Sequence, residues 1–363
     1  MAGETLMMSF IVLSGIYFVF ICLVIAALVK EKICQGKSEL SATVIVCIDH
    51  DKENLPGLIE ALIRLDYPET LLEILLVTES SDREIVSEIQ KSTAKNKRIR
   101  PVLIYDREEG LTGRKNAITQ AVGVANGEII LLTESNCRPG SQWVRRMINC
   151  FDEETGMVMG FPSIEKGSGL MHRFLEFDQL AKVAVQTAGA YWNIPPYSSA
   201  RNLAFRRRLF FEVNGYESSG SITTGDDFFL TRDIWLKTKR PFRHAIHPES
   251  FVETKIKNKP RKFLVQQLKK SGQIYHLAPF YKGVGLFILM YYGAVPIAMF
   301  TLPPLIWAGS LLIKTILEWT GIMLAGKRFG FKYLAFWYPL LAPVYPLYVF
   351  TSAALINKRK KPV

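Results

Sequence analysis

The fold of this chain is decided by the stretch Glu128-Ile129-Ile130-Leu131-Leu132-Thr133-Glu134-Ser135-Asn136-Cys137-Arg138-Pro139. Its first part is a continuous apolar run, which is typical of a strand buried on both faces in a parallel sheet. The polarity then changes abruptly at Glu134. Because open α/β sheets bind ligands at the carboxyl ends of their strands, we expect Glu134 and Asn136 to face one ligand. A solvated strand-to-helix turn is the alternative for this stretch taken alone.

Strands and helices alternate in the segment that leads to this stretch. Apolar and β-branched runs predict strands at 43–48, 73–77, 102–105 and 128–132, with helical patterns between them. This order predicts a mostly parallel sheet with helices on both faces. Acidic residues follow three of these strands, namely Asp49, Glu79 and Glu134, so they should gather along one edge of the sheet. Such an edge suits a sugar nucleotide or another polyol phosphate.

Both ends of the chain are apolar. Residues 6–29 carry no charge and are numerous enough to cross a bilayer as a helix. Lys30 and Lys32 follow this span, so the positive-inside rule places the residues after it in the cytoplasm. Two further apolar regions, 284–313 and 333–356, predict three or four spans in total, because prolines interrupt the first of them. The basic tail at 357–363 favours three spans.

The composition indicates which kinds of partner the protein binds and whether its cysteines are oxidised. A formal net charge of +12 suits a protein that lies against anionic lipid and handles phosphate-bearing ligands. A nucleic-acid partner is not expected, because the sequence has no aromatic-interleaved basic module and no zinc-ligand spacing. The five cysteines form no CxxC pair, and we expect all of them to be free thiols in a cytoplasmic domain.

Residues 42–273 resemble glycosyltransferase family 2, whose membrane-anchored members carry a nucleotide-sugar domain of the GT-A fold. The loop Asp49-His50-Asp51-Lys52-Glu53-Asn54 stands where the family has a first acidic loop that cups the nucleobase and ribose. The stretch Gly110-Leu111-Thr112-Gly113-Arg114-Lys115-Asn116-Ala117 resembles the loop whose basic residues approach the diphosphate. The resemblance therefore implies donor-binding roles for Asp49, Asp51, Glu53, Glu79, Arg114 and Lys115. Taken alone, the basic helix start would be a solvated face.

The turn Glu134-Ser135-Asn136 aligns with the DxD motif of this family, which holds a divalent ion on the donor diphosphate. The alignment implies that Glu134 and Asn136 bind the donor and a Mg²⁺ or Mn²⁺ ion. Asparagine replaces an anionic oxygen ligand with a neutral carbonyl, which weakens that metal site. It does not exclude one, because Mg²⁺ is usually held by only one or two carboxylates plus substrate phosphates.

The stretch Thr224-Gly225-Asp226-Asp227 matches the Gly-Asp-Asp motif that carries the catalytic base of the family. An acceptor hydroxyl must lose its proton as it attacks an anomeric carbon, and a carboxylate within hydrogen-bond reach can accept that proton. We assign the base to Asp227 and a supporting role to Asp226. The alternative for the pair in isolation is an N-cap acid beside a second acid favoured by the helix dipole.

The acceptor side departs further from the family pattern. Asn202, in the stretch Ser199-Ala200-Arg201-Asn202, is a candidate for lining the acceptor cleft. The family has QxxRW where this chain has Gln266-Gln267-Leu268-Lys269-Lys270, so Gln266, Lys269 and Lys270 are assigned to the acceptor or the diphosphate. Lysine reproduces neither a guanidinium fork nor an aromatic platform. The basic amphipathic segment 261–278 should also lie along the membrane interface.

These features predict an α/β protein. A GT-A (Rossmann-like) domain at 40–280 lies between an anchor at 1–30 and a membrane region of two or three spans at 284–356. The expected function is that of a membrane-bound inverting glycosyltransferase that moves a sugar from a nucleotide-sugar donor, expected to be a UDP-sugar, to a lipid or polyprenyl-type acceptor. The expected location is a bacterial-type inner membrane with the catalytic domain in the cytoplasm. Two alternatives are a catalytically impaired paralogue that binds a nucleotide sugar as a scaffold subunit, and a polysaccharide synthase.

Overall fold

The computed structural model of the protein describes residues 2–48, 52–93, 96–106, 108–111, 113–194, 198–220, 225–256, 264 and 279–357. The chain divides into two compact units. Residues 31–166 and 189–256 form an α/β unit, and residues 1–30, 167–188 and 257–363 form a helical unit. The predicted domain at 40–280 therefore contains most of the α/β unit, but its residues 167–188 and 257–280 belong to the helical unit.

The α/β unit is built on a seven-stranded sheet of order β3-β2-β1-β4-β8-β6-β9. The strands are β1 (Ala42–Cys47), β2 (Leu72–Glu79), β3 (Ile99–Ile104), β4 (Ile129–Glu134), β6 (Met157–Gly160), β8 (Leu203–Arg206) and β9 (Phe242–Ala245). The first four strands are parallel to one another, whereas β8 runs antiparallel between β4 and β6. The prediction of a mostly parallel α/β sheet is confirmed.

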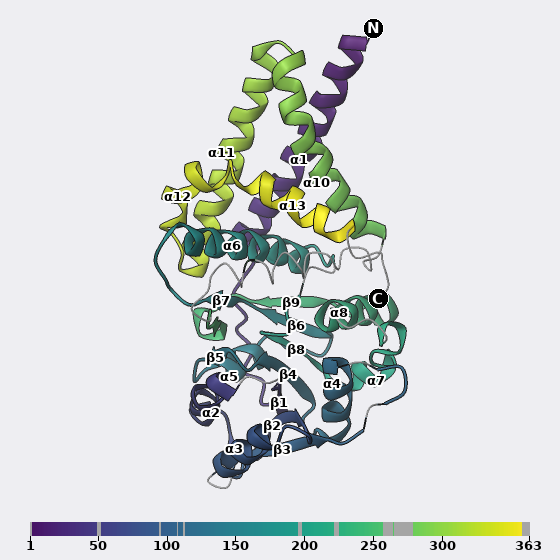
Figure 1. The fold of residues 1–363 in the computed structure, drawn as a ribbon, viewed down its shortest axis with the longest axis vertical. Helices are drawn as coiled ribbons and strands as arrows, with labels where there is room; N and C mark the ends of the chain where they lie inside the picture. Colours follow the sequence, from purple (N-terminus) through teal and green to yellow (C-terminus); the bar gives the residue numbers. More distant parts are fainter. Residues whose placement is uncertain are drawn as a thin grey trace. The chain divides into compact units, whose positions relative to one another are not determined.

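Helices cover both faces of this sheet (Figure 1). One face carries α2 (Leu55–Ile63), α3 (Arg83–Thr93) and α5 (Trp143–Ile148), and the other carries α4 (Gly113–Val124), α7 (Arg207–Glu212) and α8 (Asp226–Thr238). Side chains of β1 alternate between the two cores, with Val44 and Val46 in the first and Ile45 in the second. Burial on both faces fixes the strands, and hence the loops at their carboxyl ends.

A small second sheet supports the turn after β4. It has the order β5-β10-β7, formed by β5 (Cys137–Pro139), β10 (Val252–Thr254) and β7 (Pro162–Ile164). β10 pairs antiparallel with β5 and parallel with β7. Because β5 begins directly after Asn136, the turn Glu134-Ser135-Asn136 is held between the large sheet and the small one.

Cys34 and Cys150 form a disulfide within the α/β unit, with their Cα atoms 5.0 Å apart. The prediction that all five cysteines are free thiols is therefore wrong for this pair, whereas Cys22, Cys47 and Cys137 form no disulfide. The two bonded cysteines are 116 residues apart in the sequence, so no local spacing signals the pair. The fold brings the segment after residue 30 to the end of α5.

Glu73, near the start of β2, links neighbouring strands at the edge of the sheet formed by the amino ends of the parallel strands. Its carboxylate accepts hydrogen bonds from Thr43 Oγ1 at 2.9 Å, from Arg100 Nη2 at 2.8 Å and from the backbone and side-chain nitrogens of Asn126 at 3.0 Å each. Burial alone would raise the pKa of Glu73, but the bonds from Asn126, Arg100 and Thr43 outweigh it and hold the pKa below its usual 4.5.

We expect Glu73→Gln to lower the free energy of unfolding by about 1–3 kcal/mol at pH 7, because charge-assisted hydrogen bonds are lost. A carboxyl with a lowered folded pKa stabilises the protein above its unfolded pKa, and this contribution disappears as the pH falls through the folded pKa. Urea unfolding of both proteins at pH 7 and at successively lower pH below 4.5 should show the difference shrinking. A difference that stays constant across this range would contradict the role given to the carboxylate.

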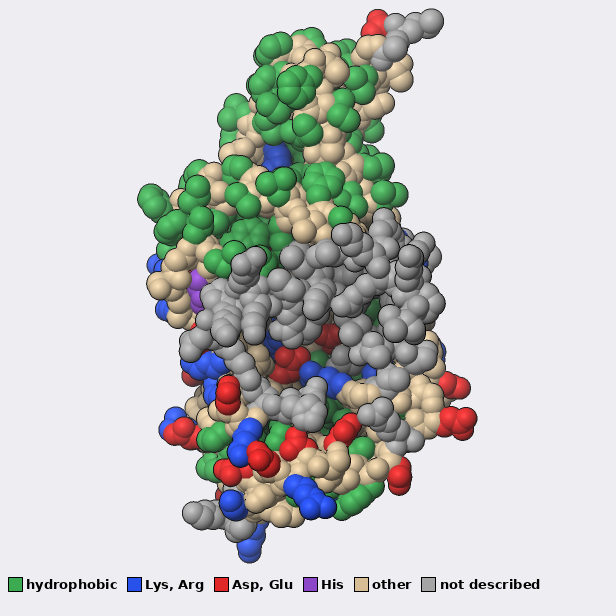
Figure 2. Space-filling view, in the orientation of Figure 1, with side chains coloured by type: hydrophobic (Ala, Val, Ile, Leu, Met, Phe, Trp, Pro, Cys, Tyr) green, Lys and Arg blue, Asp and Glu red, His purple; other side chains and the backbone are tan. Residues whose placement is uncertain are grey.

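The helical unit contains the membrane-spanning candidates. Its helices are α1 (Ala2–Lys30), most of α6 (Leu170–Tyr191), α10 (Pro279–Thr301), α11 (Pro304–Phe329), α12 (Leu334–Leu341) and α13 (Tyr345–Asn357). By length and composition, three described helices could cross a membrane, namely Gly3–Lys30, Lys282–Thr301 and Pro304–Phe329. The bent pair Leu334–Leu341 and Tyr345–Ala354 makes four if it counts as one span. Hydrophobic side chains cover α10 and α11 (Figure 2).

The apolar region 284–313, which prolines were expected to interrupt, is divided between two helices. α10 ends at Thr301 and α11 begins at Pro304, so the break falls at Pro303 and Pro304. Pro296 lies inside α10 and does not end it. Lys314 and Glu318, which lie between the two predicted apolar regions, are inside α11.

Those two charges are satisfied inside the helical unit. Lys314 Nζ lies 2.8 Å from Glu318 Oε2, one helical turn away. The hydroxyl groups of Tyr17 and Tyr338 donate to the Glu318 carboxylate at 2.5 Å and 2.8 Å. Because a paired and hydrogen-bonded charge costs far less in an apolar medium than an isolated one, α11 can carry both residues and still be a membrane-spanning candidate.

Candidate functional site

The carboxyl ends of β2 and β4 carry two of the predicted donor residues, Glu79 and Glu134, at one edge of the sheet. In the parallel pairing of β1 with β4, Cys47 lies opposite Glu134. The carboxyl end of β1 therefore lies beside Glu134. In the acidic loop that follows β1, Asp49 and Asp51 lie outside the described residues, while Glu53, two residues further on, is exposed. Glu79 closes β2 and is also exposed.

Glu134 is held between two arginines. Arg114 Nη1 lies 2.9 Å from Oε1 of Glu134, and Arg201 Nε lies 3.2 Å from Oε2. The exposed fractions of the three side chains are 27% for Arg114, 17% for Glu134 and 6% for Arg201. Arg114 comes from the start of α4 and Arg201 from the segment before β8, so this ion-pair cluster joins three parts of the chain.

The segment 199–202 connects this cluster to the Gly-Asp-Asp motif. The backbone N–H of Ala200 donates to Oδ2 of Asp227 at 3.1 Å. The next residue, Arg201, bonds to Glu134 through its side chain and accepts from Thr133 Oγ1 through its carbonyl at 3.0 Å. Two successive residues thus bind the acid at the end of β4 and the acid at the start of α8. This assembles the two acidic motifs, which are far apart in the sequence.

Asp227 lies in the first turn of α8, after the N-cap residue Gly225. Gly225 has a φ of 84°, a left-handed conformation that favours glycine. The Asp227 carboxylate also accepts from the backbone N–H of Phe228 at 2.9 Å. The carboxylate is therefore fixed in place, as a base must be, and it is partly exposed. Asp226 is the first residue of α8.

Lys115 takes a different position from the one its family role implies. Its side chain is 2% exposed, and Nζ donates to the carbonyl of Ser219 at 2.5 Å. The same Nζ lies 4.6 Å from the ring centre of Phe229 in α8. Gly220 packs so closely on the neighbouring loop that a Cβ there would lie 2.4 Å from the carbonyl oxygen of Gly110. Lys115 thus holds the segment that contains Ser219 and does not lie at an exposed phosphate site.

We expect Lys115→Met to lower kcat about tenfold and to leave KM for the donor nearly unchanged, because the bond that holds Ser219 is lost while the donor contacts remain. A direct phosphate contact predicts the opposite, namely a raised KM for the donor. Steady-state kinetics at varied donor concentration separates the two cases. Lys91→Met, a matched change at an exposed position of α3, should alter neither constant.

Asn202, predicted to line the acceptor cleft, is 1% exposed and lies in the interior. Its Oδ1 accepts from Trp143 Nε1 at 2.9 Å, and its Nδ2 donates to the carbonyls of Ser250 and Phe161 at 2.8 and 3.2 Å. These bonds join β8 to α5 and to the region around β10. In this structure Asn202 therefore positions the segment 199–202, and contact with an acceptor would need a different arrangement.

The described residues fit a divalent ion poorly. Both oxygens of Glu134 already pair with guanidinium groups, and Asn136 Nδ2 donates to the carbonyl of Lys255 at 3.4 Å. No cluster of three or more His, Cys, Asp or Glu side chains suited to a metal ion occurs among the described residues. A carboxylate that is neutralised by two arginines, beside a neutral amide, is a weak ligand set for Mg²⁺ or Mn²⁺.

Two arginines, Arg201 and Arg138, contact residues of the site, and their roles were not predicted. Arg201 lies in the stretch Ser199-Ala200-Arg201-Asn202, of which only Asn202 was predicted to have a role. Arg138 donates to the carbonyls of Ser135 and Asn54 at 3.1 and 2.9 Å, so it ties the turn after β4 to the end of the first acidic loop. The sequence shows both arginines, but it does not show their partners, because the fold brings these partners from distant parts of the chain. Gln266, Lys269 and Lys270, and all of segment 261–278 except Leu264, lie outside the described residues.

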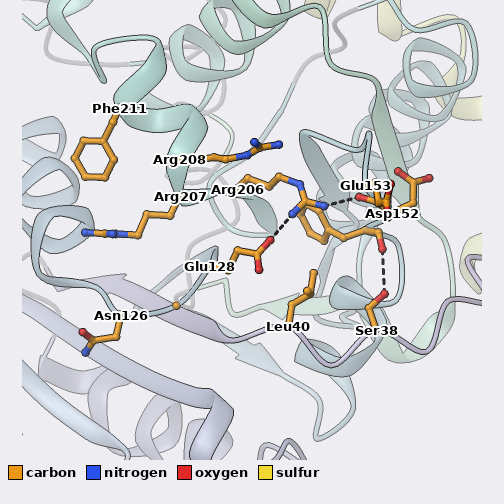
Figure 3. A pocket seen from close by; sticks show the side chains of 12 residues that line it. Ser38, Leu40, Asn126, Glu128, Asp152, Glu153, Arg206, Arg207, Arg208 and Phe211 are labelled. Carbon is orange, nitrogen blue, oxygen red and sulfur yellow. Dashed lines mark hydrogen bonds and ion pairs between the residues drawn. The ribbon is translucent and has the colours of Figure 1, made fainter.

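A cavity of about 860 Å³ lies at the opposite edge of the sheet, beside the amino end of β4 (Figure 3). Its lining includes Asn126, Glu128, Arg206, Arg207 and Arg208 and contains none of the predicted site residues. Arg206 pairs with Glu128, and Arg207 donates to the carbonyls of Val122 and Gly123. Because these cations are largely satisfied by protein groups, we assign no ligand to this cavity.

Known proteins match the part of the chain that contains the site at the carboxyl ends of the strands. The model of the glycosyl transferase family 2 matches residues 43–216, which include β1, β2, β4, the Glu134 turn and β8. A probable N-acetylgalactosaminyltransferase 8 of Caenorhabditis elegans is 22% identical over 234 residues, which are 57% of this chain and 54% of the relative. The probable glycosyltransferase YdaM of Bacillus subtilis is 22% identical over 188 residues, or 50% of this chain and 44% of the relative. The chain spans about half the length of these relatives.

A solved structure shares the fold over nearly the whole chain. The mannosyltransferase PcManGT of Pyrobaculum calidifontis, in complex with GDP-Man and Mn²⁺, superposes with a TM-score of 0.63 at 17% identity and covers 99% of both chains. At this identity the likeness shows the fold alone. Together with the family match, it supports the predicted GT-A fold. Residues 43–216 of the chain thus match glycosyl transferase family 2.

Proposed function

We propose that the protein is a membrane-anchored inverting glycosyltransferase that moves a sugar from a nucleotide-sugar donor to a lipid or lipid-linked acceptor. The observation that carries the proposal is the short segment 199–202, which binds Glu134 through Arg201 and Asp227 through Ala200. Glu134, the proposed donor-side acid, and Asp227, the proposed base, are therefore each bonded to one of two neighbouring residues in this segment. Preorganised groups of this kind stabilise a transition state without further rearrangement.

In the proposed reaction, the acceptor hydroxyl gives its proton to the Asp227 carboxylate as its oxygen attacks the anomeric carbon of the donor. The bond from the anomeric carbon to the phosphate oxygen breaks, and the nucleoside diphosphate leaves with the electron pair. A single displacement inverts the anomeric configuration. General-base assistance of this kind contributes roughly 10²–10⁴-fold to such a step.

The helical unit supports a lipid or polyprenyl-type acceptor. Three described helices are apolar enough to cross a membrane, so the enzyme would act where lipid acceptors are concentrated. Lys30 and Lys32 follow the first of these helices and favour a cytoplasmic catalytic unit on a bacterial-type inner membrane. A UDP-sugar is the donor we propose, and a GDP-sugar is the competing one because PcManGT was solved with GDP-Man.

The test uses the full-length protein in lipid nanodiscs with radiolabelled UDP- and GDP-sugars and a total lipid extract. Transfer predicts label in the organic phase together with an equal amount of released nucleoside diphosphate. Nucleotide binding without release in any combination of donor and lipid would contradict the proposed activity and favour the impaired paralogue. Product that grows into long chains would instead favour a polysaccharide synthase.

A further inference from the structure

The helical unit has two distinct ends. At one end, the amino-terminal part of α1 packs against the turn between α10 and α11, with Phe10 and Leu302 in one buried cluster. At the other end, the side chain of Arg328 donates to the carbonyl of Leu28, so α1 and α11 finish together. We call the first the Leu302 end and the second the Lys30 end, after the last residue of α1. The three candidate spans run between these two ends.

The helix α12 starts at the Lys30 end and runs back along α11. Trp319 Nε1 donates to the carbonyl of Ala335 at 3.0 Å, and the Tyr338 hydroxyl donates to Glu318 at 2.8 Å. Glu318 lies eleven residues before Phe329, the last residue of α11, which is roughly 16 Å at 1.5 Å per residue. This is about half of a hydrocarbon core of roughly 30 Å. Because α12 ends less than one turn after Tyr338, it reaches only the middle of the membrane.

The chain then bends by 65° between α12 and α13. The hydroxyl groups of Tyr345 and Tyr348, in the first turn of α13, donate to the two oxygens of Asp178 at 3.2 and 3.4 Å. The same carboxylate accepts from Lys182 Nζ at 2.6 Å. Asp178 and Lys182 belong to α6, which has 22 residues but is not among the helices apolar enough to cross a membrane. The start of α13 is therefore bonded to a charged helix.

These bonds decide the direction of α13. A helix that carries Asp178 and Lys182 lies outside the hydrocarbon core or at its boundary, where tyrosine hydroxyl groups are also common. A crossing α13 would carry Tyr345 past the middle of the membrane toward the Leu302 end, and Asp178 and Lys182 would have to follow it into lipid at a large cost. The α13 helix instead contacts α10 and ends at the level where α10 begins, which is the Lys30 end (Figure 1).

The face of α12 and α13 that is turned away from these contacts is apolar and exposed. Its side chains form an apolar stripe with helical spacing and exposed fractions of 86, 53, 46 and 66%, namely Phe336, Leu340, Val344 and Leu347. Residues 333–356 carry no charge, whereas Lys332 precedes them and a basic tail follows them. Because the pair follows directly on α11, a membrane-spanning candidate, the hydrocarbon of the lipid is the medium that would cover this stripe.

We propose that α12 and α13 form a re-entrant element, which enters the lipid from the Lys30 end, contacts the hydrocarbon of that leaflet through the apolar stripe, and returns to the same end. The membrane is then crossed three times, by α1, α10 and α11, and the apolar region 333–356 is not a span. The two termini of the chain lie on opposite sides of the membrane.

Cysteines at the two termini of the full chain test the number of crossings. In a background in which Cys22 and Cys47 are changed to serine, one variant carries Gly3→Cys and another carries a cysteine added after the last residue. Right-side-out membrane vesicles are treated with a membrane-impermeant maleimide before and after permeabilisation, and the background protein without an added cysteine is the control. We expect one terminal cysteine to react before permeabilisation and the other only afterwards. Reaction of both under the same condition requires an even number of crossings and would overturn the inference.

A fluorescence measurement tests which element turns back in the lipid. A nitrobenzoxadiazole probe is attached to Leu340→Cys or Leu347→Cys in the same background, in nanodiscs whose lipids carry a nitroxide quencher at the headgroup or at the end of the acyl chain. The Leu340 probe should be quenched most by the nitroxide at the chain end, and the Leu347 probe most by the one at the headgroup. The lipid-facing control Ile297→Cys, on α10, should be quenched, and Glu60→Cys, at an exposed position of α2, should not.

Stronger quenching of the Leu347 probe by the nitroxide at the chain end would place α13 on a path across the membrane and would contradict the re-entrant element. Probes at both positions that no lipid nitroxide quenches, together with a Leu340→Cys disulfide between two chains, would show that a second copy of the protein covers the apolar stripe. That result would overturn the assignment of the stripe to lipid. Neither measurement depends on sugar transfer, so the inference can fail while the proposed function stands.

Discussion

Asp227→Asn should lower the rate of sugar transfer roughly 10²–10⁴-fold and leave nucleotide affinity nearly unchanged. The asparagine side chain cannot accept the acceptor proton, but it keeps the size of aspartate and one oxygen for the N–H of Ala200 or Phe228. In the proposed site, donor binding depends on groups at the ends of β1, β2 and β4, which the substitution does not change. The measurement is single-turnover transfer with saturating donor, together with a nucleotide titration of the same preparation.

The matched control is Asp66→Asn, which makes the same chemical change at an exposed aspartate whose side chain is 60% accessible. It should transfer sugar at the wild-type rate. Transfer by Asp227→Asn within about twofold of the wild type would show that another group removes the proton. A loss of nucleotide binding in parallel with turnover would show that Asp227 holds the α8 end in place and is not the base.

Removal of the Cys34–Cys150 disulfide by the double substitution to serine should lower the unfolding free energy of the α/β unit by about 4 kcal/mol. The reason is loop closure, since the bond joins residues 116 positions apart and restricts the unfolded chain. The fall in the thermal midpoint, measured by intrinsic fluorescence with and without reductant, tests this effect. Reductant should destabilise the wild-type protein and leave the double variant unchanged.

Cys22→Ser is the control, because Cys22 is a free and exposed cysteine of α1. It should show the wild-type midpoint and the wild-type response to reductant. Alkylation of the denatured protein without reductant should modify Cys22, Cys47 and Cys137 and spare the bonded pair. Modification of all five cysteines in protein taken directly from cells would contradict the disulfide.

The same alkylation measurement tests on which side of the membrane the α/β unit lies. Disulfides persist mainly in oxidising compartments, although intracellular proteins of hyperthermophiles also carry them. The basic residues after the first helix instead favour the cytoplasm. An oxidised Cys34–Cys150 pair in intact cells therefore requires either an outward-facing unit or a cytoplasm that keeps disulfides.

The sheet and its acidic edge could be predicted because local signals carry them. The apolar runs that became β1, β2 and β4 are buried on both faces, and this is the pattern that distinguishes central parallel strands. The carboxyl ends of parallel strands meet at one edge, so the position of Glu134 followed from the order of the elements. The family motifs added the expected identity of the ligand and of the base.

The partners of the site residues could not be predicted, because they come from distant parts of the chain. Glu134 pairs with residues 20 and 67 positions away, and Asn202 with groups up to 59 positions away. A basic residue such as Lys115 looks the same in a motif whether it faces a phosphate or a buried carbonyl. The disulfide likewise joins residues 116 positions apart, so no local pattern signals it.

The most direct test of this account is an experimental structure of the full-length protein with UDP or GDP bound. The account predicts the nucleotide at the carboxyl ends of β1, β2 and β4, beside the turn that carries Glu134. A nucleotide bound elsewhere, for example in the cavity beside Arg206, Arg207 and Arg208, would contradict it.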